Sequence, residues 1–412
     1  MKYINRIFFS VGSMALMILV FLVALIIGTW LENDYGTQTA KLLVYNAKWL
    51  EVLMFLLAVN LIINIFRYNM FRREKIAALV FHISFLIILI GAGVTRYFGF
   101  EGIMPIEEGK AMGSMHSADP YLQLYATDKQ QQYRFEKKFY ASQIVNNHFS
   151  SNFQLDGHTQ VTFEVLDFLP KAVDSIIPDD SFNTIVELVV PSKEGGMQSV
   201  YLQDGEVFSH DGLKITLNQD TVPDAIKLFS NGAQMTINTP YDIDFLKMSD
   251  QTRGGIKKDS IQPFLQRQLY QVNGKSFVFK RIYESATLSK VSLGHKSEIG
   301  VDALKLKITD GDKTQELYLS GGEKRVPNTE IFTFNGLDYI LAYGAKQIEL
   351  PFLVGLKKFT LERYPGTDSP SSYASDVIVY DSLRPTPLEH KIFMNHVLDY
   401  KGYRFFQSSY MP

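Results

Sequence analysis

The chain contains 412 residues, and its 41 lysines and arginines nearly balance its 43 aspartates and glutamates, which leaves a formal net charge of -2 at pH 7. This balance predicts no nucleic-acid partner, because nucleic-acid binding relies on excess positive charge. The absence of cysteine excludes disulfides, thiolate catalysis, zinc–thiolate sites, iron–sulfur clusters and Cys-x-x-Cys-His cofactor attachment within this chain.

Strongly apolar sequence is confined to residues 1–97, and three stretches in it are long enough to span a membrane. A helix needs about 20 apolar residues to cross the hydrocarbon layer. The predicted spans are residues 7–31, 49–66 and 76–97. The apolar run of the first is longer than a typical signal-peptide core, and no small-x-small cleavage site stands out near its end. We therefore expect it to be retained as a span.

The distribution of positive charge predicts the orientation of the spans. Between the second and third lies a short basic segment, and such loops remain on the cytoplasmic side. Residues 32–48 and 98–412 are then expected outside, where Trp30, Trp49 and Tyr97 mark the outer boundaries as interfacial aromatics. The cytoplasmic cations on which this orientation rests are Lys2, Arg6, Arg67, Arg72, Arg73 and Lys75.

Residues 98–412 are predicted to form a β-rich extracytoplasmic domain. From Tyr121 onward apolar and polar residues alternate with period two, which is typical of half-buried antiparallel strands. Clear examples begin at Val161, Thr184, Leu213 and Ala303. Asp-Gly and Asn-Gly pairs at 204–205, 211–212, 273–274, 310–311 and 335–336 predict turns. Many short strands indicate a sandwich or an open barrel, and the polar segment 249–259 is a candidate boundary between two lobes.

His82 is the strongest candidate for a functional residue. It lies about six residues inside the third predicted span, roughly 9 Å from its cytoplasmic end. Ionisable residues at such depth are unfavourable unless they have a function or a partner. A histidine there can bind haem iron or another metal, or relay a proton; the alternative is a hydrogen bond to a neighbouring helix. No other histidine lies in the spans, so a second imidazole ligand would come from another segment or chain.

Arg72 and Arg73, just cytoplasmic of His82, are candidates for pairing with haem propionates; the alternative is that they determine topology alone.

Asn60 and Asn64 are expected to form hydrogen bonds between helices, and Gly91 and Gly93 to permit close helix approach. No catalytic residue is predicted, because the chain has no nucleophile elbow, phosphate loop or complete calcium loop. The external histidines do not occur at metal-ligand spacing: His116, His148, His158, His210, His295, His390 and His396.

Three late segments carry a family resemblance. Residues 350–367, LPFLVGLKKFTLERYPGT, residues 370–377, PSSYASDV, and the end of the chain, with Asn395 and YKGYRFFQSSY at 400–410, resemble the ResB (CcsB) family of System II cytochrome c biogenesis proteins. The N-terminal arrangement agrees, with Gly28-Thr29 near the end of the first span and a histidine in the third. The middle of the chain adds only a compatible β pattern.

The resemblance implies a multi-pass protein of the bacterial cytoplasmic (inner) membrane that works with CcsA. Together the pair would export haem and attach it to apocytochrome c outside. By this resemblance His82 is an axial ligand of a non-covalent b-type haem, and the second ligand belongs to CcsA. The chain would be one component of a cytochrome c synthetase (haem lyase) complex, with no catalysis alone.

The family returns to the membrane after its external domain, whereas this chain stops at Met411-Pro412. We therefore expect the gene product to continue past Pro412, as in a fused CcsBA protein. The alternative function is a membrane-anchored external ligand-binding or scaffold protein that carries no cofactor.

Overall fold

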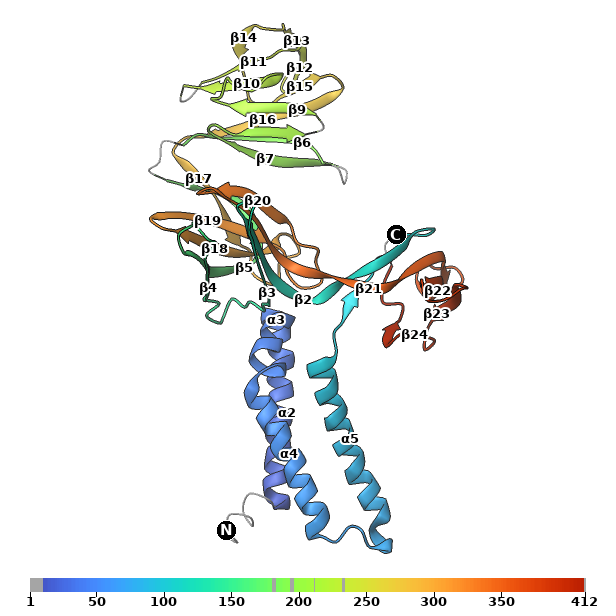
Figure 1. Cartoon of the computed structure of the whole chain (residues 1–412). Helices are drawn as coiled ribbons and strands as arrows, with labels where there is room; N and C mark the ends of the chain where they lie inside the picture. Colours follow the sequence, from blue (N-terminus) through green and yellow to red (C-terminus); the bar gives the residue numbers. More distant parts are fainter. Residues whose placement is uncertain (1–9, 180–182, 193–195, 211, 232–233, 411–412) are drawn as a thin grey trace. The chain divides into compact units, whose positions relative to one another are not determined.

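The computed structural model describes residues 10–179, 183–192, 196–210, 212–231 and 234–410 (Figure 1). The chain forms two compact units, one made of residues 1–172 and 292–412 and the other of residues 173–291. The second unit is therefore an insertion in the sequence of the first. Lys2, Arg6, Asp211, Met411 and Pro412, on which parts of the sequence interpretation rest, lie outside the described residues.

Three helices of the first unit are long and apolar enough to cross a membrane: α2 (Val11–Tyr35), α4 (Lys48–Arg67) and α5 (Ile76–Phe98). Helices are confirmed at the three positions predicted for spans, although residues 7–9 fall outside the described part. Ser10 caps α2, because its side chain accepts a hydrogen bond from Ser13 N while the Ser13 side chain accepts from Ser10 N. The 3₁₀ turn η2 (Arg73–Lys75) precedes α5.

The segment expected as an irregular loop, residues 32–48, is mostly helical. α2 continues four residues past its predicted end because no helix-breaking residue precedes Gly36, which has φ 88°. The short helix α3 (Thr37–Ala40) and the π-helical turn η1 (Lys41–Tyr45) follow directly. Gly36 is required there, since an added Cβ would lie 2.6 Å from the His295 ring.

The β part of the first unit contains two main sheets. One has the order β1-β2-β21-β22-β23, with β3 also on β2 and β20 also on β21; the other has the order β17-β5-β18-β19, with β4 on β5. All of β17 except Ser292 belongs to the second unit. The bounds are β1 (Gly102–Ile103), β2 (Ala111–Thr127), β3 (Gln132–Lys138), β4 (Phe149–Phe153), β5 (Val161–Pro178), β17 (Ala286–Ser292), β18 (Val301–Asp310), β19 (Lys313–Ser320), β20 (Thr329–Phe334), β21 (Leu337–Arg363), β22 (Pro370–Tyr380), β23 (Leu388–Phe393) and the separate pair β24 (Leu398–Tyr400) and β25 (Tyr403–Phe405).

The long strands β2 and β21 take part in two hydrophobic cores. Near Leu124 and Leu341 they pack with β5, β18 and β19 around buried residues such as Phe163. Near Phe352 and Val354 they pack with β22 to β25. The register between β2 and β21 shifts between Met112 and Ser114 and between His116 and Pro120. Such shifts bend a strand pair, and the second one lies between Met115 of one core and Leu122 of the other.

The second unit has its own core between two sheets. One sheet has the order β13-β12-β15-β16-β6-β7, and the other the order β14-β11-β10-β9-β8. Pairing is antiparallel as predicted, except that β9 and β10 are parallel. The bounds are β6 (Ile185–Pro191), β7 (Met197–Gln203), β8 (Val207–His210), β9 (Leu213–Leu217), β10 (Ala225–Ser230), β11 (Met235–Asn238), β12 (Ile243–Lys247), β13 (Arg253–Ile256), β14 (Ile261–Pro263), β15 (Gln268–Val272) and β16 (Lys275–Tyr283).

The division of the β region differs from the expected one. The polar segment 249–259 contains β13, which pairs with β12, and the turns on either side of β13, inside the second unit. Gly254 lies in β13 opposite Phe245, whose ring would meet an added Cβ at 2.4 Å. The glycines thus serve close packing within one sheet. The units divide instead between residues 172 and 173 and between residues 291 and 292.

Candidate functional site

His82 lies in the second turn of α5 and is half-buried. Its Nδ1 is 2.7 Å from the carbonyl oxygen of Ala78, one turn earlier. A carbonyl only accepts hydrogen bonds, so Nδ1 carries a proton, and it is Nε2 that holds the lone pair in the neutral form of the ring. A backbone carbonyl that fixes the second ring nitrogen is the usual support of a metal-binding histidine. The arrangement therefore presents one oriented nitrogen ligand.

No second ligand is found among the contacts that His82 makes with the described residues. Its ring contacts Phe81 edge-on at 5.8 Å between centroids, and no residue of α5 is buried by the described part of the chain. The close helix approach expected at Gly91 and Gly93 is also not made by described residues, since an added Cβ at either would meet nothing within 4 Å. The lipid or another polypeptide is left to cover α5.

Arg72 and Arg73 lie between α4 and α5 and are exposed. Arg72 immediately precedes η2, and Arg73 is its first residue. Neither side chain forms an ion pair with another described residue, so both charges remain available to an external anion. The structure thus brings the two arginines to the same end of α5 as His82 without a direct contact.

Asn60 connects two spans, as predicted. Its Nδ2 donates to Ser13 Oγ at 3.1 Å, which joins α4 to α2. Asn64 Nδ2 donates to Asn60 Oδ1 at 2.5 Å. Both asparagines are buried, and Asn64 Oδ1 has no partner among the described residues. Among the described residues, then, Asn60 joins two helices, whereas Asn64 bonds only to Asn60 of its own helix, so the interhelical bond expected of Asn64 is not made there.

A polar junction attaches the helices to the β part of the same unit. Gln38 Oε1 accepts hydrogen bonds from Ala141 N and from Tyr343 Oη, each at 3.1 Å. Thr39 Oγ1 donates to Ser142 Oγ at 2.9 Å. All five residues are buried, so the junction is specific and excludes water. Sequence reasoning missed it, because these residues are about 100 to 300 positions apart.

An ionic cluster continues this junction. Lys41 Nζ lies 2.6 Å from Glu323 and 3.6 Å from Asp119. Asp119 also accepts from Tyr140 Oη at 2.6 Å and pairs with Lys138 at 2.6 Å. Burial opposes ionisation of Asp119, but the hydrogen bonds from Lys138 and Tyr140 outweigh it and hold its pKa below the ordinary 3.8. Burial and the Asp119 carboxylate raise the pKa of the Tyr140 phenol.

The external histidines form no group of three or more metal ligands within the described part of the chain. His390 and His396 nevertheless lie together, with rings stacked at 4.7 Å between centroids. The intervening residues form a turn in which Phe393 pairs with His396. Sequence reasoning missed this pair, since a spacing of six fits neither a strand nor a helix but does fit two arms of a turn.

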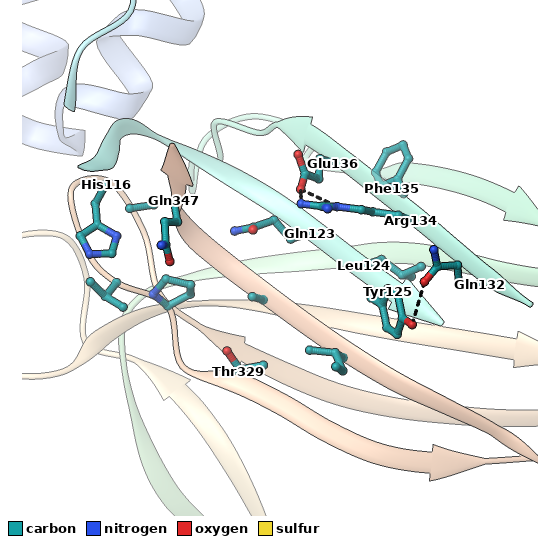
Figure 2. Close-up of a pocket in the computed structure, with 15 residues that line it drawn as sticks. His116, Gln123, Leu124, Tyr125, Gln132, Arg134, Phe135, Glu136, Thr329 and Gln347 are labelled. Atoms are coloured by element: carbon teal, nitrogen blue, oxygen red, sulfur yellow. Dashed lines mark hydrogen bonds and ion pairs between the residues drawn. The ribbon is translucent and has the colours of Figure 1, made fainter. Parts of the chain in front are cut away.

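Figure 2 shows a groove of about 430 Å³ on the first sheet of the first unit. Across its floor Gln123 is paired with Ala342, and Ala342 is paired with Thr329, so a short side chain lies between longer ones. At one end Arg134 Nε donates to Glu136 at 2.9 Å. His116 lies at the other end, opposite Gln347. The groove is thus a mixed polar and apolar surface on rigid strands.

Three membrane helices followed by a large β region define a membrane protein that carries a β-structured domain. The sequence profile of the ResB-like family matches residues 72–165 and 315–412, which include Arg72, Arg73 and His82. Over these two segments the chain is similar to the ResB-like family. Both matched segments lie in the first unit, and the inserted second unit falls in the gap between them.

The chain is also similar to protein NrfI of Wolinella succinogenes, with 28% identity over 398 residues. The alignment covers 97% of this chain and 30% of NrfI. The chain thus spans less than a third of the length of this curated relative.

Proposed function

We propose that this chain is the haem-holding ResB-like subunit of a System II cytochrome c synthetase in the bacterial cytoplasmic membrane. With CcsA, or with a fused CcsA domain, it holds haem and supports its export and its attachment to apocytochrome c outside. His82 is one axial ligand of a non-covalent b-type haem, and CcsA supplies the other. The chain alone is not catalytic.

The observation that supports this proposal is the orientation of the His82 imidazole, which is fixed by a hydrogen bond within the helix. Its Nδ1 is held at 2.7 Å by the Ala78 carbonyl, so Nε2 is the free ligand atom on a helix that buries no residue against the described chain. A single imidazole on an uncovered helix suits a haem shared between two polypeptides. Bound haem supplies the group that is transferred; this chain's part is to orient it and shield it.

The test is His82→Ala expressed with its CcsA partner at matched protein levels. We expect loss of bound haem and of holocytochrome, with partial recovery on adding imidazole, which can occupy the cavity. Ser84→Ala is the matched control, because Ser84 Oγ also bonds a backbone carbonyl of α5, that of Phe81 at 2.7 Å. Wild-type haem and holocytochrome in His82→Ala would refute the ligand role.

Arg72 and Arg73 are proposed to pair with the haem propionates. Their replacement by glutamine should weaken haem binding less than loss of His82 does, because only charge pairing is removed. Haem titration of both variants against wild type measures this order. An unchanged affinity would leave the arginines with a role in topology alone.

The groove of Figure 2 favours the alternative, an external ligand-binding protein without cofactor. An absorption spectrum of the purified complex separates the two functions. A b-type haem band that is lost in His82→Ala supports the haem-holding function. A protein that matures cytochromes normally while it lacks haem would favour the alternative.

A further inference from the structure

An exposed apolar side chain projects from the turn that joins β22 to β23. Leu383 is 82% exposed, and Arg384, Pro385 and Pro387 follow it. Asp381 holds the turn, since its carboxylate accepts hydrogen bonds from Leu383 N at 3.0 Å and from Tyr400 Oη at 2.6 Å. The turn is therefore fixed in a form that keeps Leu383 away from the core.

A continuous series of ring contacts links this turn to the end of α5. The Arg384 guanidinium lies 5.7 Å from the Tyr400 ring. Tyr400 contacts Phe352 at 4.9 Å, and Phe352 contacts Tyr403 at 5.5 Å. Tyr403 in turn contacts Phe100 at 6.0 Å.

Phe100 follows the last residue of α5 by two positions. Phe98 is 81% exposed and Phe100 is 57% exposed. Tyr97, which precedes them and is also exposed, is of the residue type that lies in the interfacial layer of a bilayer. The turn at 381–387 thus belongs to the same packed aromatic cluster as Phe100, two positions beyond the span.

The charges beside Leu383 fit a lipid headgroup. Asp381 and Asp399 are paired, with Lys401 and with Arg404 respectively. Glu389 is paired with Lys357. In contrast, Arg384 and Lys391 form no ion pair with another described residue. The apolar Leu383 side chain is suited to contact lipid acyl chains, and the neighbouring Arg384 guanidinium is suited to contact lipid phosphates.

We propose that the turn at 381–387 inserts into the interfacial layer of the bilayer beside the end of α5, with Leu383 against acyl chains and Arg384 at lipid phosphate. The occupant of this surface is the membrane itself. The β22–β25 region is then held against the bilayer at two points, the end of α5 and this turn. This role is independent of haem binding and of the side on which the domain lies.

The cysteine-free chain allows a direct test by single-cysteine labelling. Leu383→Cys, Phe100→Cys and Met394→Cys are each labelled with an environment-sensitive fluorophore, and the full chain is placed in nanodiscs with or without spin-labelled lipid. Met394 is the matched control, because it is 83% exposed but lies beyond the other end of β23. We expect lipid quenching at 383 similar to that at 100, and none at 394.

Two results would overturn the proposal. Quenching at 383 as weak as at 394 would place the turn in water. A blue-shifted emission at 383 without lipid quenching would show that protein, not lipid, covers it. Arg384→Gln tests the charge separately: in nanodiscs with anionic lipid it should reduce quenching at 383 and leave quenching at 100 unchanged. Unchanged quenching at 383 would refute the contact with phosphate.

Discussion

The junction at Gln38 provides the sharpest test of how the helices are attached to the β part. Gln38→Leu keeps a side chain of similar size but removes the oxygen that accepts from Ala141 N and Tyr343 Oη. Tyr343 is fully buried, and Ala141 is 1% exposed. Water therefore cannot replace the lost acceptor without opening the junction.

The expected loss follows from two orphaned donors. A buried donor left without a partner costs about 1 to 3 kcal/mol, so the variant should lose about 2 to 6 kcal/mol of unfolding free energy. The lower half of this range is expected, because Gln38 lies in a short helix at the border of the unit and relaxes more readily than a strand.

Chemical unfolding of the purified protein in detergent measures the change, with Tyr343→Phe and the double variant completing a cycle. In the Gln38→Leu background Tyr343→Phe removes an orphaned hydroxyl, so it should cost about 1 to 2 kcal/mol less than in wild type. The rate of amide hydrogen exchange at Ala141 reports on the junction itself. Of the two single variants, only Gln38→Leu should raise this rate. Additive losses, or unchanged exchange at Ala141, would refute the junction as described.

Further predictions concern acid stability, backbone strain and topology. The pKa of Asp119 is lowered in the folded protein, so its stabilising effect is complete above about pH 3.8 and is lost as the pH falls towards the folded value; Asp119→Asn should flatten that part of an acid-unfolding curve, and an unchanged curve would contradict this. Gly36→Ala should destabilise by at least about 1 kcal/mol at φ 88°, and His295→Ala should recover only the part due to the ring contact, as measured by thermal unfolding. Single cysteines at Lys75 and Gly402 should be labelled from the cytoplasm and from outside respectively, and labelling of position 402 only after permeabilisation would reverse the orientation.

The spans were predictable because their signal is local. Twenty apolar residues in sequence require no knowledge of distant partners, and both α4 and α5 begin and end within one residue of the predicted bounds. The hairpin turns were predictable for the same reason: Asn273 and Asn335 have φ of 48° and 49° and are followed by glycines of positive φ, as two-residue turns of this kind require.

The division into units was not predictable in this way. The polar composition of residues 249–259 predicted a boundary there. However, the amino-acid composition need not change at the two points where an inserted unit begins and ends. Strand β5 illustrates this, since it runs from Val161 to Pro178 across the border at residue 172 without a break. Only the contacts between distant strands separate the two cores.

The candidate site was predictable in part, and the limit has a physical cause. Depth and solitude in the span identified His82, but the free ring nitrogen is a property of the folded helix, in which the carbonyl of Ala78 lies one turn before the ring. Because this contact exists before any ligand binds, the imidazole need not change its tautomer or turn about its side-chain bonds on ligation, and less entropy is lost. Under the proposed function the second ligand would come from another segment, so this sequence would carry only half of the signal for the site. That α5 buries no residue against the described part of the chain agrees with this proposal.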